Sequence, residues 1–167
     1  RRTLTFSLGA AALTGIVVAL TLWLLMLPTP PRVTRFLITP TAEAPLSGTA
    51  LAISPDGTRI VYTGASEAQL SVRAIDKLEP NNIVGLGSTT QPFISPDGQW
   101  IGFFADESLR KVHAGGGEVF TLCDTPAFIR PDVGFGSIWC PDGNIIFGAW
   151  MMGLLSVSAD GGVPEPL

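Results

Sequence analysis

The sequence predicts an all-β fold built from repeated units, preceded by a single transmembrane α-helix, and three observations lead to this prediction. The 167 residues include 19 glycines and 14 prolines, which favour turns over long helices. A Pro-Asp-Gly motif begins at Pro55, Pro96 and Pro141, positions that are 41 and 45 residues apart. Positions 3–31 carry no charged side chain. The length corresponds to about one ordinary domain.

The first predicted element is a transmembrane helix over residues 8–27, where Thr14 and Thr21 are the only polar side chains. Twenty helical residues span about 30 Å, the thickness of the bilayer's hydrocarbon core. Trp23 lies near the far end, where an indole suits the membrane interface. The alternative is a cleaved signal peptide, whose apolar core is usually shorter, about 7–15 residues, and is followed by small residues.

The segments on either side of the helix are polar or rich in proline. We expect residues 1–7 to form a cytoplasmic juxtamembrane end and residues 28–35 to form a Pro-rich linker, because prolines at 28, 30 and 31 end a helix. Two arginines lie on each side of the apolar stretch, so the positive-inside rule does not decide the orientation.

A row of small residues follows one face of this helix. Ala11, Gly15 and Ala19 are four residues apart, and small residues at that spacing let two membrane helices approach closely. A homodimer through this face is one reading. The other is that membrane helices are in general rich in small residues.

Three repeats follow the linker, near residues 50–90, 91–135 and 136–167. In each one an apolar stretch enters the Pro-Asp-Gly turn, a β-rich stretch leaves it, and a third and a short fourth strand complete the unit. A period of about 40–45 residues fits one four-stranded propeller blade per repeat. Rings of this kind have about 4–8 blades. The sequence therefore predicts an incomplete β-propeller whose last blade exposes an apolar face.

The turn motif itself has a structural explanation. Proline presets φ for the second turn position, aspartate bonds to its own backbone, and glycine supplies a positive φ. We therefore assign a structural role to all nine residues of the three motifs, which are Pro55, Asp56, Gly57, Pro96, Asp97, Gly98, Pro141, Asp142 and Gly143.

Charge and motif content exclude several functions. Residues 36–167 carry 6 basic and 14 acidic side chains, an acidic balance that argues against nucleic-acid binding. The chain has none of the catalytic motifs of protein kinases and no Gly-x-Ser-x-Gly turn, so we expect no catalysis within these residues. No cofactor or metal site is expected. Cys123 and Cys140 are either a disulfide or buried thiols.

Binding is expected at a loop instead. The connection between the second and third repeats is longer than its counterpart and contains Phe128, Arg130, Asp132 and Phe135. Trp150 belongs to a second apolar segment. Loops at blade ends often carry function, so these residues form a candidate partner-binding surface, for a protein or a small ligand. The alternative is that they pack on the core.

Residues 36–167 resemble the TolB-like, WD-repeat-like β-propellers, whose signature is Ser-Pro-Asp-Gly followed by an apolar–aromatic strand. The third repeat departs from it with Cys140 in place of serine. The membrane helix, the linker and the segments at 95–106 and 119–124 together resemble the C-terminal half of bacterial transmembrane serine/threonine protein kinases. There a cytoplasmic kinase domain precedes the anchor and a propeller lies outside.

This resemblance implies a non-catalytic, membrane-tethered sensor or protein-interaction domain that acts in signal transduction. It would sit in the bacterial inner membrane with one span and with its propeller outside the cytoplasm. Two alternatives remain open. One is the propeller of a membrane-anchored prolyl-oligopeptidase-like hydrolase, and the other is a TolB-like envelope interaction protein.

Overall fold

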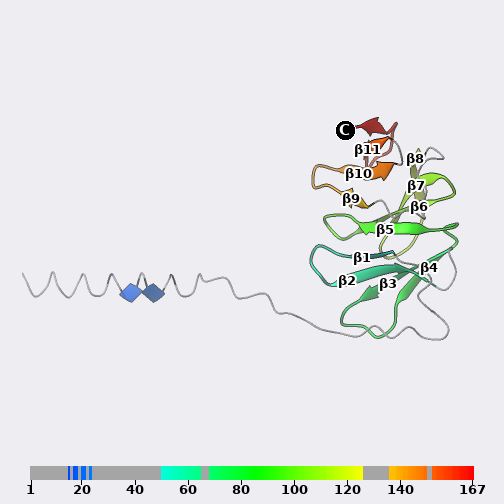
Figure 1. Ribbon diagram of the computed structural model, residues 1–167. Coiled ribbons are helices and arrows are strands. Elements are labelled where there is room, and N and C mark those ends of the chain that lie inside the picture. Colours follow the sequence, from blue (N-terminus) through cyan, green and yellow to red (C-terminus); the bar gives the residue numbers. More distant parts are fainter. Residues whose placement is uncertain are drawn as a thin grey trace, which may run out of the picture. The chain divides into compact units, whose positions relative to one another are not determined.

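The computed structural model describes residues 15, 17, 18, 20, 21, 23, 50–64, 68–125, 136–149 and 152–167 (Figure 1). The chain divides into two compact units, Arg1–Ile38 and Thr39–Leu167. Each unit is described below by itself.

The first unit is described at six positions, all of them helical and exposed. They are Gly15, Val17, Val18, Leu20, Thr21 and Trp23. The hydroxyl of Thr21 donates to the carbonyl oxygens of Val17 and Val18, the back-bonding that threonine commonly makes within a helix. Over the positions that can be described, no helix has the length and hydropathy needed to cross a membrane. Most of the segment expected to do so, including Ala11 and Ala19, lies outside the described residues.

The second unit contains three antiparallel four-stranded sheets, which we name blades A, B and C. Blade A consists of β1 (Leu51–Ile53), β2 (Arg59–Thr63), β3 (Gln69–Ala74) and β4 (Asn81–Val84). Blade B consists of β5 (Thr90–Ile94), β6 (Trp100–Ala105), β7 (Ser108–His113) and β8 (Val119–Asp124). Blade C consists of β9 (Ser137–Trp139), β10 (Asn144–Ala149), β11 (Gly153–Ser158) and β12 (Glu165–Pro166).

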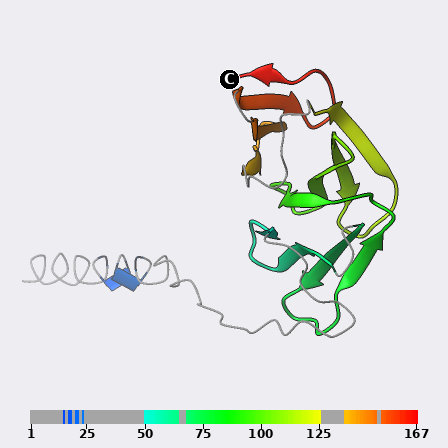
Figure 2. The ribbon, with the colours of Figure 1, turned by 45° about the vertical axis from the view of Figure 1, so that its right-hand side comes forward.

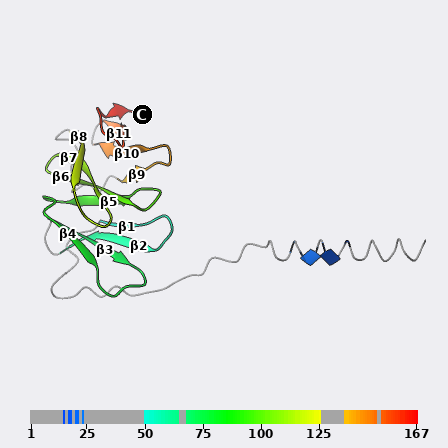
Figure 3. The same ribbon diagram turned by 180° about the vertical axis from the view of Figure 1, so that it is seen from behind.

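The strands of each blade pair in chain order, so every connection within a blade is a hairpin. The first strands of successive blades contact one another, β1 with β5 and β5 with β9. Figures 1 and 3 show the three sheets following one another in chain order from opposite sides, and Figure 2 shows the same order in a turned view. First strands that meet in this way are the inner strands of a propeller.

Two hydrophobic clusters hold the three blades together. Each cluster lies between two successive sheets, whose facing sides are apolar. The cluster between blades A and B includes Val61, Leu70, Val72, Ile101, Phe103 and Val112. The cluster between blades B and C includes Phe93, Phe104, Leu109, Ile145, Phe147 and Leu155. The rings of Phe104 and Phe147 meet edge to face with centroids 5.7 Å apart, a favourable geometry for aromatic pairs.

One close approach within blade B requires a glycine. A Cβ added at Gly102 would lie 2.2 Å from the ring of Phe93, which is itself buried. The missing side chain thus lets the Phe93 ring lie across β6 in the cluster between blades B and C.

The outer face of blade C differs from the matching faces of blades A and B. Leu70, Leu109 and Leu154 occupy the same register position of the three blades, opposite Thr63, Phe104 and Gly148. Leu70 and Leu109 are fully buried against the next blade, whereas Leu154 is 56% exposed. Ile138 on the same face is also exposed. The exposed apolar face expected for the last blade is therefore confirmed.

Candidate functional site

The three Pro-Asp-Gly motifs form turns between the first and second strands of their blades. In each turn the aspartate accepts a hydrogen bond at Oδ1 from the backbone N–H two residues later. The pairs are Asp56 with Thr58, Asp97 with Gln99, and Asp142 with Asn144, all at 3.0 Å. The glycines follow with φ of 68°, 70° and 88°. Each glycine supplies the left-handed conformation that the turn needs.

The first two turns contain a serine that the third lacks. Ser54 donates its hydroxyl hydrogen to Asp56 and accepts the backbone N–H of Arg59 at 2.9 Å. Ser95 makes the same two bonds, to Asp97 and from Trp100. In the third turn the backbone N–H of Cys140 donates to Asn144 four residues later, whereas that of Ser54 donates to Arg59 five residues later. The third turn is therefore one residue shorter.

These bonds keep the turn carboxylates ionised. The Ser54 hydroxyl, followed by the N–H and hydroxyl of Thr58, lowers the pKa of Asp56 to about 2. Ser95 is the main cause of the lowered pKa of Asp97, and the backbone N–H of Asn144 is the main cause for Asp142. Each carboxylate is thus hydrogen-bonded within its own turn, as expected for a residue with a structural role.

The loop expected to bind a partner is not among the described residues. Phe128, Arg130, Asp132, Phe135 and Trp150 all lie outside them. The described residues beside that loop are Thr125, whose N–H donates to the Glu107 carbonyl at 2.7 Å, and Gly136, whose carbonyl accepts from Gly148. Because the strands are antiparallel, both lie at the blade end opposite the Pro-Asp-Gly turns.

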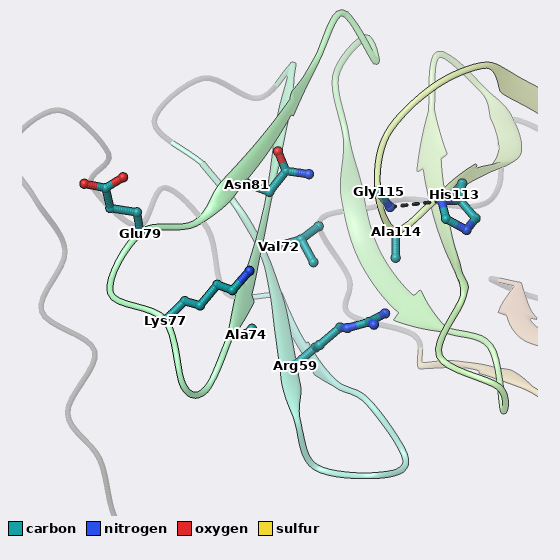
Figure 4. A pocket seen from close by; sticks show the side chains of 9 residues that line it. All are labelled: Arg59, Val72, Ala74, Lys77, Glu79, Asn81, His113, Ala114 and Gly115. Carbon is teal, nitrogen blue, oxygen red and sulfur yellow. Dashed lines mark hydrogen bonds between the residues drawn. The ribbon is translucent and has the colours of Figure 1, made fainter.

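A cleft of about 270 Å³ lies between blades A and B at the end where the Pro-Asp-Gly turns are (Figure 4). We call it the A–B cleft. Its polar lining residues are Arg59 at the start of β2, Lys77, Glu79 and Asn81 around the β3–β4 connection, and His113 at the end of β7. A second cavity of about 570 Å³ shares Arg59, Ala74 and Lys77 with it.

Arg59 and His113 are held in place by specific contacts. The Nη1 atom of Arg59 donates to the carbonyl of Gly98 in the turn of blade B, at 2.9 Å. Nδ1 of His113 accepts the N–H of Gly115 at 3.1 Å, and its ring meets Trp100 edge to face at 5.6 Å. The cleft thus joins residues that are more than 50 positions apart in the chain. No local pattern in the sequence indicated it.

The seam between blades B and C has its own cationic contact. Nζ of Lys111 donates to the carbonyl of Ala159 at 2.7 Å and lies 5.0 Å from the centroid of the Trp100 ring. A cation over an indole face is attracted by the ring quadrupole. Lys111 therefore stabilises the contact between two blades.

The two cysteines are both free thiols, so the disulfide alternative is not formed. Burial, with a smaller effect of the Asp124 charge, raises the pKa of Cys123 to about 11. The thiolate is the reactive form of cysteine, so Cys123 is an inert core residue at neutral pH. No group of three or more His, Cys, Asp or Glu side chains suited to a metal ion occurs among the described residues.

Comparison with known proteins identifies the fold. No family model matches the sequence, and no curated protein does. Among solved structures, TolB from Acinetobacter baumannii matches with a TM-score of 0.55 and 18% identity, over 72% of this chain and 32% of that chain. A putative TolB from Agrobacterium tumefaciens matches with a TM-score of 0.52 and 22% identity, over 68% and 46%. The fold is a TolB-like β-propeller.

A third similar structure is part of a nidogen/laminin complex, with a TM-score of 0.56 and 18% identity over 70% of this chain and 46% of that chain. At these identities the likeness concerns the fold alone. The present chain spans less than half the length of each of these three structures. Its TolB-like blades therefore correspond to part of a propeller.

Proposed function

We propose that this chain is a non-catalytic, membrane-tethered TolB-like propeller that binds a partner outside the cytoplasm. In this proposal it is the extracytoplasmic half of a bacterial transmembrane serine/threonine protein kinase. The observation that carries the proposal is the order of two segments: an uncharged stretch over 3–31 precedes three blades of a propeller. A span of that length fits a bilayer, and propeller blades present loops to partners.

The three blades are part of a larger ring in this proposal. Blade C presents Leu154 and Ile138 to solvent at positions where blades A and B pack on a neighbour. A blade buries its apolar face by stacking on the next one, and propellers have about 4–8 blades. This exposed face therefore supports a larger ring, in which a further blade would pack against it.

The anchor would be the helix over residues 8–27, with residues 1–7 in the cytoplasm. The helical state of the described positions between 15 and 23 supports a helix there. Exposed Val17, Val18, Leu20 and Trp23 give it an apolar surface. A face made of Ala11, Gly15 and Ala19 would let two copies pair in the membrane and so transmit a change from outside.

The anchor and the orientation can be tested together in bacteria. We would express the full chain with a C-terminal alkaline phosphatase, which is active only outside the cytoplasm, and extract membranes with alkaline carbonate. The proposal predicts an active phosphatase that stays in the membrane pellet. A matched variant replaces residues 8–27 with a polar linker of the same length, and it should be soluble and inactive. Carbonate extraction of the unaltered chain, or an inactive phosphatase, would contradict the proposal.

A second candidate is an envelope interaction protein without any kinase, and the fold shared with the two TolB structures favours it. The two candidates differ in signalling. We would fuse the chain to a cytoplasmic kinase domain and measure autophosphorylation while the propeller is crosslinked from outside. A change in kinase activity supports the sensor role. If the propeller captures a partner while the kinase activity stays constant, the result supports the envelope role.

A further inference from the structure

The cationic side chains of the blades fall into two groups. Arg110 forms an ion pair with Asp106 at 3.2 Å, Lys111 donates to Ala159, and Nε of Arg73 donates to the carbonyl of Lys77. These three cations have partners within the fold. The ammonium of Lys77 makes no hydrogen bond or ion pair with any residue that the structure describes. Within the described residues, the side chain of Arg59 makes one hydrogen bond, from Nη1 to the carbonyl of Gly98.

Both of these less engaged cations line the A–B cleft. In Figure 4 the ammonium of Lys77 extends toward Val72, and the guanidinium of Arg59 extends toward blade B, in the direction of Ala114. The carboxylate of Glu79, the one acid among the lining residues, is turned away from them in the same view. The cleft therefore combines two exposed cations with an apolar wall that includes Val72 and Ala114.

The remaining polar groups of the cleft add donors. Because Nδ1 of His113 accepts the N–H of Gly115, the neutral imidazole carries its proton on Nε2. Asn81 contributes a side-chain amide. A guanidinium has five N–H groups, and among the described residues only one of those of Arg59 has a partner, the carbonyl of Gly98. Polar groups of both blades thus line the cleft.

The carboxylates of the neighbouring Asp56 and Asp97 are hydrogen-bonded within their own turns. Asp56 accepts bonds from Ser54 and Thr58 in its own turn, and Asp97 accepts from Ser95 and Gln99. Among the described residues neither forms an ion pair with a cleft cation. Their charges reduce the local positive potential without filling the cleft.

We propose that the A–B cleft binds a carboxylate group through Arg59 and Lys77, with Asn81 and His113 as additional donors. A guanidinium presents parallel N–H groups that match a carboxylate, and an ammonium adds a point charge. The volume of about 270 Å³ lies just below the range of typical ligand pockets, about 300–1,000 Å³, and suits a small group rather than a large cofactor. The carboxylate belongs to an acidic side chain of a partner or to a free small acid.

The test uses the full chain in a non-ionic detergent and fluorescence anisotropy of a labelled hexaglutamate peptide at low salt. We expect saturable binding that weakens as salt is added, because the cleft is open to solvent. A hexaglutamine peptide should not bind. Succinate as competitor separates the two sources: displacement at low concentration indicates a site for free small acids, and displacement only by the peptide indicates a partner's side chains.

Lys77→Gln is the decisive variant, because the Lys77 ammonium has no hydrogen-bond or ion-pair partner in the part of the chain that the structure describes. It should weaken hexaglutamate binding about two- to fivefold, the effect of one exposed charge. Arg59→Gln should weaken it further, and thermal melts would show whether the lost bond to Gly98 also matters. Arg110→Gln is the matched control, since it removes the same charge at the other end of blade B.

Two results would overturn this assignment. One is the absence of hexaglutamate binding at low salt by a chain that melts normally. The other is an equal loss of affinity in Lys77→Gln and Arg110→Gln, which would show attraction to overall charge and no site. Neither result bears on the membrane anchor or on partner binding elsewhere, so the proposed function is tested independently.

Discussion

Leu109 and Leu154 occupy the same register position in successive blades, yet one is fully buried and the other is 56% exposed. Leu109 packs in the cluster between blades B and C. Leu154 faces away from blade B, on the side of blade C where the described residues place no further sheet. The two leucines therefore contribute differently to the free energy of folding, although their local settings are the same.

We predict that Leu109→Ala lowers the free energy of unfolding by about 2–5 kcal/mol, as buried leucines commonly do. Leu154→Ala should change it by about 0.5 kcal/mol or less, because the side chain is already half in water. Urea unfolding of the purified full chain measures both. Equal losses would show that the outer face of blade C is packed against something in solution.

The pH dependence of stability should reflect the first turn. The folded pKa of Asp56 is lowered to about 2, below its unfolded value of about 3.9. Its contribution is therefore complete above about pH 4 and is lost as the pH falls toward 2. Asp56→Asn should reduce the drop in melting temperature over this interval, while Glu118→Gln, outside the turns, serves as control. An unchanged drop in Asp56→Asn would contradict the assignment.

Gly102 should tolerate no side chain. Gly102→Ala places a Cβ against the buried ring of Phe93 and should destabilise the protein by about 1–3 kcal/mol, the usual cost of overpacking. Gly136→Ala is the control, because nothing lies within 4 Å of its added Cβ. Thermal melts compare the two. Equal melting temperatures would mean that the Phe93 ring moves aside without strain.

The two thiols should react at different rates. Cys123 is buried and its pKa is raised to about 11, whereas Cys140 is half-buried in a turn. Alkylation of the native chain at pH 7.5 should therefore label Cys140 first, and Cys140→Ser should remove the fast phase. Mass spectrometry without reductant measures this. Failure of both thiols to react, even after unfolding, would indicate a disulfide.

In the proposed function, two copies of the anchor helix pair through a face that contains Gly15, so pairing should depend on this residue. Gly15→Leu would separate two helices packed through the small-residue face, so association in a bacterial membrane two-hybrid assay should fall several-fold. Val17→Leu is the control, since residues two apart on a helix do not share a face. An unchanged signal in Gly15→Leu would leave the row of small residues without a role in pairing.

Several features of the fold were predictable because they depend on neighbours in the chain. The Pro-Asp-Gly turns fix three reversals through bonds that span two residues, such as Asp56 to Thr58. The third turn, at Cys140, is one residue shorter than those at Ser54 and Ser95. The turn before β4, the fourth strand of blade A, has no clear signal in the sequence. It contains Leu78 and Pro80 and, unlike its counterparts, no glycine.

The candidate sites were harder to predict. The sequence pointed to the loop containing Phe128 and Arg130, which lies outside the described residues. The A–B cleft gave no signal, because Arg59 and His113 belong to different repeats and each looks like an ordinary strand residue. Their meeting depends on how one blade packs on the next. A single sequence contains no direct information on the distance between residues of different blades.

The sequence by itself determined the period, the turns and the alternation of apolar side chains, because these depend on φ preferences and on contacts a few residues away. Tertiary structure alone decided which leucine is buried, which cations find partners and where a cleft opens. Those outcomes follow from the stacking of sheets, in which side chains about 40 residues apart either meet or remain in water.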